Sequence, residues 1–173
     1  RIVIAIPEGP DHDLWTEAND APRLLQACND VDFEVEVKWD SQVVDNFTSQ
    51  GIVVQETMDK LLRFDILRRP NSEFLFQAAI GDFPSQVLFQ TDLEGNAQYL
   101  RVKRDGDDWC VTYSTDGVVW SGCTTVTYEL VANQIGVHAT SVSFSGPAPL
   151  FESRVDYFFD VTNRIDPEDG LVD

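Results

Sequence analysis

Hydrophobic and polar residues alternate with a period of two along most of the chain. The segment 33–39 (FEVEVKW) places four apolar residues on one face and three charged residues on the other, as expected of a half-buried β-strand. The same period recurs in QGIVVQE (50–56), LLRFDIL (61–67), FLFQAAI (74–80), QVLFQT (86–91), QYLRVKRDG (98–106), WCVTYS (109–114), VVWSGCT (118–124), QIGVHATSVSF (134–144) and SRVDYFFDV (153–161). Turn residues such as Glu94-Gly95-Asn96 separate these segments. Short strands at this spacing predict an all-β fold, an antiparallel two-sheet β-sandwich, over residues 1–163. We interpret residues 164–173 as a linker toward a following domain.

A hairpin is predicted where Asp116-Gly117 separates two of these strands, because this dipeptide suits a two-residue type I′ turn. A turn at that point sets the register of the two strands so that Cys110 opposes Cys123. Counted outward from the turn, this is a non-hydrogen-bonded pair, whose Cα atoms approach to about 4.5 Å, within the range of a disulfide. The sequence therefore predicts a Cys110–Cys123 disulfide; the alternative is two reduced thiols that face each other by chance.

The third of the three cysteines, Cys28, is left over by this pairing. We expect it to be a buried, unreactive thiol on a strand. A disulfide indicates export to an oxidising compartment, so the sequence favours a secreted or cell-surface location.

The chain is strongly acidic, with 30 Asp and Glu residues against 12 Lys and Arg residues and a formal net charge of −18. Such a surface repels phosphate groups, which argues against nucleic acid and anionic membranes as partners. No apolar run approaches the length that membrane insertion requires. Three explanations of the acidity stay open, namely adaptation to salt, calcium sites and solubility.

A series of short motifs follows in order along residues 13–162. They include LWTEANDAPRLLQ (14–26), DFEVEVKWDS (32–41), LLRFD (61–65), YLRVKRDGDDW (99–109), YSTDGVVW (113–120) and RVDYF (154–158). Together they resemble the concanavalin A-like β-sandwich domains of the DUF1349 type, which are related to laminin G-like jelly rolls. The departures from that pattern are Cys28, the Cys110/Cys123 pair and a longer insertion near residues 68–74. The resemblance implies a jelly roll of two curved sheets, a fold that hosts lectins, polysaccharide-binding modules, glycosidases and lyases alike.

YSTDGVVW also resembles a shortened Asp-box, the β-hairpin signature of sialidases, in which these residue types lock a turn. We therefore interpret Ser114, Asp116 and Gly117 as turn residues rather than ligand contacts.

Catalytic signatures are incomplete. A retaining glycosidase needs two carboxylates about 5–5.5 Å apart, and the related hydrolases carry a Glu-x-Asp-x-Glu type of string. The nearest match, residues 34–38 (EVEVK), lacks the aspartate and ends in a cation. Jelly-roll lyases use His and Tyr, but His138 in QIGVHA only partly matches their motif. We expect the chain not to be an enzyme, and a polysaccharide lyase or glycoside hydrolase is our third hypothesis.

Carbohydrate binding is the function that the residue types favour. Sugar sites combine flat aromatic faces with amide, carboxylate and guanidinium groups, and strand parity places such groups on the face opposite the core. The candidate ligand-binding residues of this concave sheet are Arg63, Gln77, Gln90, Tyr99, Arg101, Trp109 and His138. Trp15, Trp39 and Trp120 fall at core parity, so we do not expect them to be stacking platforms.

Calcium is one open alternative for the acidic loops. Jelly rolls of the resembled type often hold a structural Ca²⁺ between the N-terminal segment and the last strand, where Asp11, Asp13 and Asp156 would supply oxygen ligands. We expect no other cofactor.

The sequence thus predicts a non-catalytic carbohydrate-binding module of a secreted or surface multidomain protein. Its expected partner is a neutral polysaccharide or oligosaccharide, because the acidic surface disfavours polyanions. The alternative is a module that binds a protein, mediates adhesion or spaces the flanking domains of the same chain.

Overall fold

The computed structural model describes residues 1–15, 18–81 and 85–163, so the predicted linker 164–173 lies outside the described residues. Strands dominate this part of the chain, and the only helical element described is a single 3₁₀ turn, η1 (Val161–Asn163). No helix among the described residues is long and apolar enough to span a membrane.

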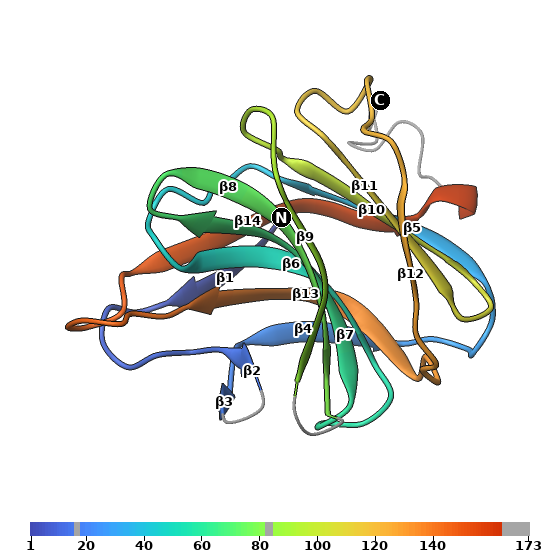
Figure 1. Cartoon of the computed structure of the whole chain (residues 1–173), viewed down its shortest axis with the longest axis horizontal. Helices are drawn as coiled ribbons and strands as arrows, with labels where there is room; N and C mark the ends of the chain where they lie inside the picture. The colour runs from blue at the N-terminus through green and yellow to red at the C-terminus, as the bar shows by residue number, and fades with distance from the viewer. Residues whose placement is uncertain (16–17, 82–84, 164–173) are drawn as a thin grey trace, which may run out of the picture.

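Two six-stranded antiparallel sheets form the body of the molecule (Figure 1). Sheet I contains, in spatial order, β1 (Ile2–Ile6), β14 (Phe151–Asp160), β5 (Phe33–Trp39), β10 (Tyr99–Asp105), β11 (Asp108–Ser114) and β12 (Thr124–Thr127). Sheet II contains β4 (Arg23–Ala27), β13 (Gln134–Ser141), β6 (Thr48–Gln55), β7 (Leu61–Arg69), β8 (Ser72–Ile80) and β9 (Gln86–Asp92). A small hairpin of β2 (Leu14–Trp15) and β3 (Ala18–Asn19) lies beside β4. The predicted all-β, two-sheet architecture is confirmed.

The core lies between the two sheets, where their alternating apolar side chains meet. In β5, Val35, Val37 and Trp39 point inward and are buried. Phe64 of sheet II packs against Trp109 of sheet I, with ring centroids 6.0 Å apart. Burying an apolar side chain of this size stabilises the fold by about 1.5–3 kcal/mol. In sheet I, the apolar residues of the period-two pattern are therefore the ones that face sheet II.

Sheet II also carries a second apolar layer, on the face that points away from sheet I. This layer consists of Leu14, Ala21, Val53, Leu61, Phe76, Ala78 and Ile80. Leu14 comes from the β2–β3 hairpin, which covers this outer face. Because both faces are covered, all eight residues of β6 are buried, including the polar residues Thr48, Ser49, Gln50 and Gln55. Strand β8 carries apolar residues on both of its faces.

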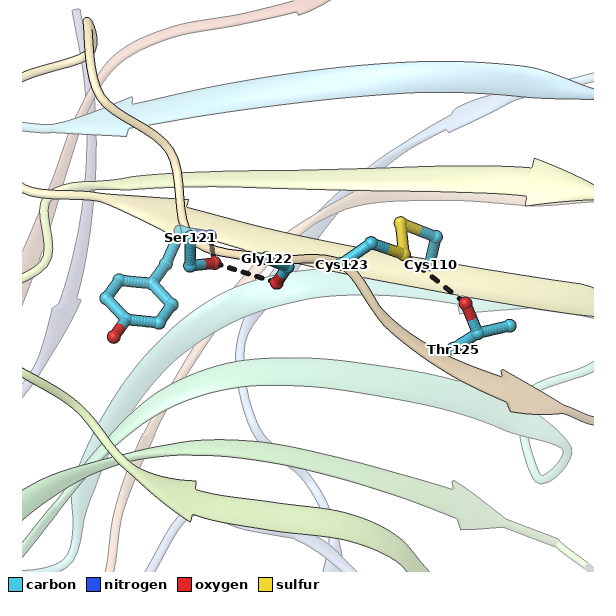
Figure 2. Close-up of a disulfide and its surroundings, with 6 residues drawn as sticks. Cys110, Ser121, Gly122, Cys123 and Thr125 are labelled. Atoms are coloured by element: carbon cyan, nitrogen blue, oxygen red, sulfur yellow. Dashed lines mark hydrogen bonds between the residues drawn. A yellow bond between two sulfur atoms is a disulfide. The ribbon is translucent and has the colours of Figure 1, made fainter.

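The Cys110–Cys123 disulfide is present, with the two Cα atoms 5.7 Å apart (Figure 2). The predicted pairing of the cysteines is thus confirmed, but the register behind it was wrong. Cys110 pairs with Thr125 in the β11–β12 ladder, and Cys123 lies just before β12. The disulfide therefore ties the incoming end of β12 to the middle of β11.

The register differs because the predicted two-residue turn is replaced by a longer loop. Asp116 Oδ1 accepts hydrogen bonds from the backbone N–H groups of Val118 and Val119. Ser114 Oγ accepts one from the N–H of Gly117, whose φ is +73°. A type I′ turn also needs positive φ at Asp116, which the described backbone does not show. The side-chain hydrogen bonds of Ser and Asp thus determine the turn, as the Asp-box resemblance implied.

Cys28 is half-buried and directly follows β4 instead of lying within a strand. Its Sγ donates a hydrogen bond to the carbonyl of Ala132 at 3.1 Å. Burial raises the pKa of the Cys28 thiol, which disfavours the reactive thiolate at neutral pH.

Replacing Cys110 and Cys123 together with Ala should lower the free energy of unfolding by about 2–3 kcal/mol, because the bond closes a short loop in the unfolded chain. The two cysteines are separated by 13 positions. Urea unfolding of both proteins measures the difference, with Cys28→Ala as the matched control that leaves the loop closed. Equal stability of the double variant and the wild type would contradict this prediction.

Candidate functional site

A buried guanidinium lies on the outer face of sheet II. On β7, Leu62, Phe64 and Ile66 point into the core, so Arg63 and Asp65 point outward, as parity predicts. Neither reaches solvent freely, since Arg63 is 3% exposed and Asp65 is fully buried. The β2–β3 hairpin and the segment before it cover them.

Arg63 has a partner for each of its five N–H groups. Nε and Nη2 both donate to Asp65 Oδ2, and Nη2 also donates to Ser49 Oγ at 3.2 Å. Nη1 donates to Asp13 Oδ1 at 3.1 Å and to the carbonyl of Leu14 at 2.6 Å. Arg63 therefore fastens the start of β2 to the sheet and has no donor left for a ligand.

Asp65 is held between two partners. Its Oδ1 lies 2.7 Å from Nε2 of His138 on β13. Burial alone would raise the pKa of Asp65, but the charge of Arg63 and the contact with His138 outweigh burial and lower the pKa to about 2. The carboxylate is thus ionised at neutral pH and serves as the counter-ion of Arg63.

Gly51 on β6 makes room for this cluster. A Cβ at that position would lie 2.4 Å from Asp65 Oδ1 and 2.8 Å from His138 Nε2. No side chain fits there without displacing Asp65 or His138. The Cβ would also lie 2.4 Å from the backbone carbonyl oxygen of Phe64, so both the neighbouring strand β7 and the Arg63–Asp65–His138 cluster require glycine at position 51.

A cavity of about 680 Å³ opens above Arg63 on the same face. We call it the site cavity, and it is lined by Asp13, Trp15, Phe47, Arg63, Leu67, Arg69, Pro70, Phe76, Val87, Thr140, Val142 and Phe144. Trp15 and Phe76 form one aromatic pair, with ring centroids 6.3 Å apart. Phe47 and Phe144 form another, at 4.7 Å and nearly perpendicular. The cavity thus offers aromatic surfaces from three loops or hairpins and one strand.

Phe47 adopts a left-handed backbone conformation, with φ at +63°, which is strained for a bulky side chain. Two backbone hydrogen bonds hold it there, from its own N–H to Arg68 O and from Val142 N–H to its carbonyl. Phe144, its ring partner, is 80% exposed at the edge of the cavity. Such local strain concentrates at functional sites.

The polar edge of the site cavity is formed by Arg69, Asp13 and Thr140. Arg69 donates to Gln90 Oε1 at 3.2 Å and lies over the ring of Phe74. Thr140 Oγ1 lies 2.7 Å from Ser49 Oγ and is nearly buried. Of the predicted binding residues, the structure therefore brings Arg63, Gln90 and His138 to this face, with Arg63 and His138 beneath the cavity and Gln90 beside it.

Gln77 and Trp109 lie elsewhere, and the sequence prediction is corrected for both. Gln77 is opposite Phe64 on β7 and is fully buried between the sheets. Trp109 is also fully buried, where its Nε1 donates to the carbonyl of Tyr128 at 2.9 Å. The cause for Gln77 is the apolar outer layer of sheet II, because apolar residues on both faces of β8 hide its parity. Trp109 is buried because it shares strand parity on β11 with Val111, whose side chain lies in the core.

Tyr99 and Arg101 lie on the outer face of sheet I, and the loop after β11 partly covers them. The guanidinium carbon of Arg101 lies 3.8 Å from the centroid of the Trp120 ring. Arg101 Nε donates a hydrogen bond to Glu36 Oε2 at 2.5 Å. The ring of Tyr99 packs against Gly117. The prediction of one shared binding sheet is thus corrected, because these two residues and Arg63 belong to different sheets.

The three aspartates considered for calcium do not form one group. Asp11 accepts a hydrogen bond from the N–H of Ser143, and Asp13 is bound to Arg63. Asp156 lies on β14 and pairs with Lys38 of sheet I. Among the residues that the structure describes, no three His, Cys, Asp or Glu side chains are placed to hold a metal ion.

Sequence analysis missed the aromatic residues of the cavity. Trp15 lies in β2, which has only two residues, so no period assigns its face, and the prediction that it points into the core is corrected because it lines the cavity. Phe47 lies in the loop before β6. Phe144 carried one usable signal, since an aromatic residue flanked by Ser143, Ser145 and Gly146 is typical of an exposed loop.

The fold is shared with proteins of known structure, although no family model matches the chain. A functionally unknown protein from Saccharomyces cerevisiae is similar over 92% of this chain and 86% of its own, with a TM-score of 0.69 and 14% identity. The GH43 protein BlXynB from Bacillus licheniformis is similar over 79% of this chain but only 32% of its own (TM-score 0.59, 13% identity). The exoplasmic/lumenal domain of VIP36, solved with Ca²⁺ and Man3GlcNAc, is similar over 83% of this chain and 76% of its own (TM-score 0.52, 12% identity).

These likenesses show the fold alone. The chain is a jelly-roll β-sandwich, the class that the sequence predicted, and a fold of the type used by carbohydrate-binding proteins. The DUF1349 resemblance stays a prediction.

The low pKa of Asp65 predicts an acid-sensitive fold. Its folded pKa of about 2 lies below the value of about 3.9 in an unfolded chain. The stabilisation is therefore complete above about pH 5 and is lost progressively as the pH falls from there to below about 2, by about 2–3 kcal/mol in total. A carboxyl-carbon NMR titration of Asp65 measures the midpoint, with exposed Asp92 as the internal comparison. A midpoint near 4 for Asp65 would contradict the ion-pair account.

Proposed function

We propose that the chain is a non-catalytic carbohydrate-binding module that takes a neutral glycan in the site cavity. The observation that carries this proposal is the composition of the cavity. Aromatic rings of Trp15, Phe47 and Phe144 line it, and the polar groups of Asp13 and Arg69 lie at its edge. Aromatic faces stack on the C–H side of a pyranose ring, and polar groups at the edge fix its orientation.

The negative charge of the chain favours a neutral ligand over a polyanion. The whole chain carries a formal charge of −18, which disfavours the approach of a polyanion. Within the site cavity, Arg63 is already neutralised by Asp65 and Asp13, and Arg69 is the remaining cation among the described lining residues. Binding of a neutral glycan should therefore depend only weakly on salt.

The environment of the two candidate catalytic groups supports a non-catalytic role. Glu36 is 1% exposed, and it accepts hydrogen bonds from Arg101 and from the hydroxyl of Tyr157 at 2.6 Å. His138 is fully buried beneath the site cavity against Asp65. Neither group has the access to substrate that acid–base catalysis requires.

Related folds support a glycan partner, since the VIP36 domain was solved with Man3GlcNAc. In the GH43 protein, the similar region makes up 32% of the chain, which supports flanking domains here also. The disulfide supports a secreted or cell-surface location.

The Trp15→Ala variant should lose at least about tenfold in affinity for the best neutral glycan, because the stacking face and its buried area are removed. Trp120→Ala, the matched control on the outer face of sheet I, should bind like the wild type. A neutral-glycan array followed by calorimetry measures both, and micromolar to millimolar dissociation constants are expected for a single module.

The reverse result would contradict the proposed site. If Trp120→Ala abolishes binding and Trp15→Ala does not, the glycan binds sheet I. Circular dichroism of each variant establishes that the β-sandwich is intact, so that lost binding is not lost folding.

A further inference from the structure

The polar side chains of the site cavity offer few hydrogen bonds to a ligand. Among the described residues, all five N–H groups of Arg63 are used by protein acceptors. Thr140 is only 2% exposed, and its Oγ1 already forms a hydrogen bond with Ser49 Oγ. Among the side chains that the structure describes, the charged lining groups without a protein partner are Asp13 Oδ2 and the N–H groups of Arg69 that do not bond to Gln90. Hydrogen bonding to a ligand by the described side chains is therefore concentrated at two points of the cavity, Asp13 and Arg69.

The walls between these two points are apolar. They are formed by Trp15, Phe47, Leu67, Pro70, Phe76, Val87, Val142 and Phe144. An unsubstituted sugar ring carries a hydroxyl on nearly every ring carbon, and each hydroxyl buried without a partner weakens binding about tenfold. An unsubstituted glycan therefore matches the aromatic walls of this cavity, but several of its hydroxyl groups would be buried without a hydrogen-bond partner.

An acetyl group matches the cavity better than a hydroxyl does. It brings one apolar methyl group for the walls and one carbonyl oxygen that the N–H groups of Arg69 are able to satisfy. An acetamide adds a single N–H donor, for which Asp13 Oδ2 is the available acceptor. Both polar points of the cavity are then used, and no ligand hydroxyl needs to be buried.

We propose that the site cavity selects acetyl-substituted neutral glycans, with the acetyl methyl group packed between Trp15 and the neighbouring apolar walls. This inference rests on the proposed carbohydrate-binding function and names its ligand class. The acetyl group occurs as an amide or as an ester, and only the amide has an N–H group to donate to Asp13.

Two matched pairs of ligands test the inference by calorimetry. The first pair is the β-1,4-linked tetramer of N-acetylglucosamine against the β-1,4-linked tetramer of glucose, which are both neutral. The second is acetylated xylan oligosaccharide against the same material after alkaline deacetylation. The acetylated member should bind at least about tenfold more tightly in one pair or both, because a methyl group is buried and a carbonyl is bonded.

Protein variants locate the effect. In Trp15→Ala, the preference for the acetylated member should fall to about twofold or less, and in Trp120→Ala it should be unchanged. Asp13→Asn should weaken binding of the N-acetylated tetramer more than binding of the acetylated xylan, because only the amide donates a hydrogen bond to the carboxylate.

Each alternative outcome has a separate meaning. Equal binding of acetylated and plain glycans would overturn this inference and leave the proposed function standing. A preference that survives Trp15→Ala would also overturn it, because the acetyl group would then lie outside the site cavity. Failure of every glycan to bind the folded protein would overturn the proposed function and this inference together.

Discussion

One buried guanidinium organises the outer face of sheet II. Arg63 is 3% exposed, and a charge removed from water is tolerated only when it is fully paired and hydrogen-bonded. Asp65 provides that charge, and Asp13 and the carbonyl of Leu14 complete the set of acceptors. Since Asp13 directly precedes β2 and Leu14 is its first residue, the same hydrogen bonds that replace water around Arg63 also hold the hairpin on the sheet. The position of Trp15, and with it one wall of the site cavity, follows from that attachment.

This attachment also explains which parts of the fold the sequence could predict. In sheet I the outer face is largely polar, so the alternation along β5 and β10 identified strands and faces directly. In sheet II the hairpin covers the outer face and adds a second apolar layer. Strand β8 consequently has apolar residues on both faces, and its period no longer tells which way Gln77 points. The existence of the strand was predictable, whereas the orientation of that side chain depended on the covering hairpin.

The site was predictable only where strands carry it. Parity alone predicted that Arg63 and His138 point away from the core, and the structure shows that their strands belong to one sheet. The same parity argument grouped Tyr99 and Arg101 with them, although β10 belongs to the other sheet. Phe47 and Phe144 lie outside the strands, and their proximity depends on two loops meeting in three dimensions. The Cys110–Cys123 pairing was predicted correctly, but from a wrong register. The register differs because Ser114 and Asp116 form side-chain hydrogen bonds within a longer loop. The register of the two strands thus depends on side-chain hydrogen bonds to the turn backbone, and not only on the two central residues of the turn.

The four tryptophans of the chain provide the most direct test that the cavity above Arg63 is the binding site. Trp15 lines this cavity, Trp39 and Trp109 are buried in the core, and Trp120 lies under Arg101 on sheet I. The measurement is a titration of the wild-type protein with the N-acetylglucosamine tetramer, followed through the four indole N–H resonances by NMR. If the tetramer binds in the site cavity, as we predict, the Trp15 resonance shifts and saturates while the other three stay in place. A shift of Trp120 with Trp15 unchanged would contradict binding in this cavity.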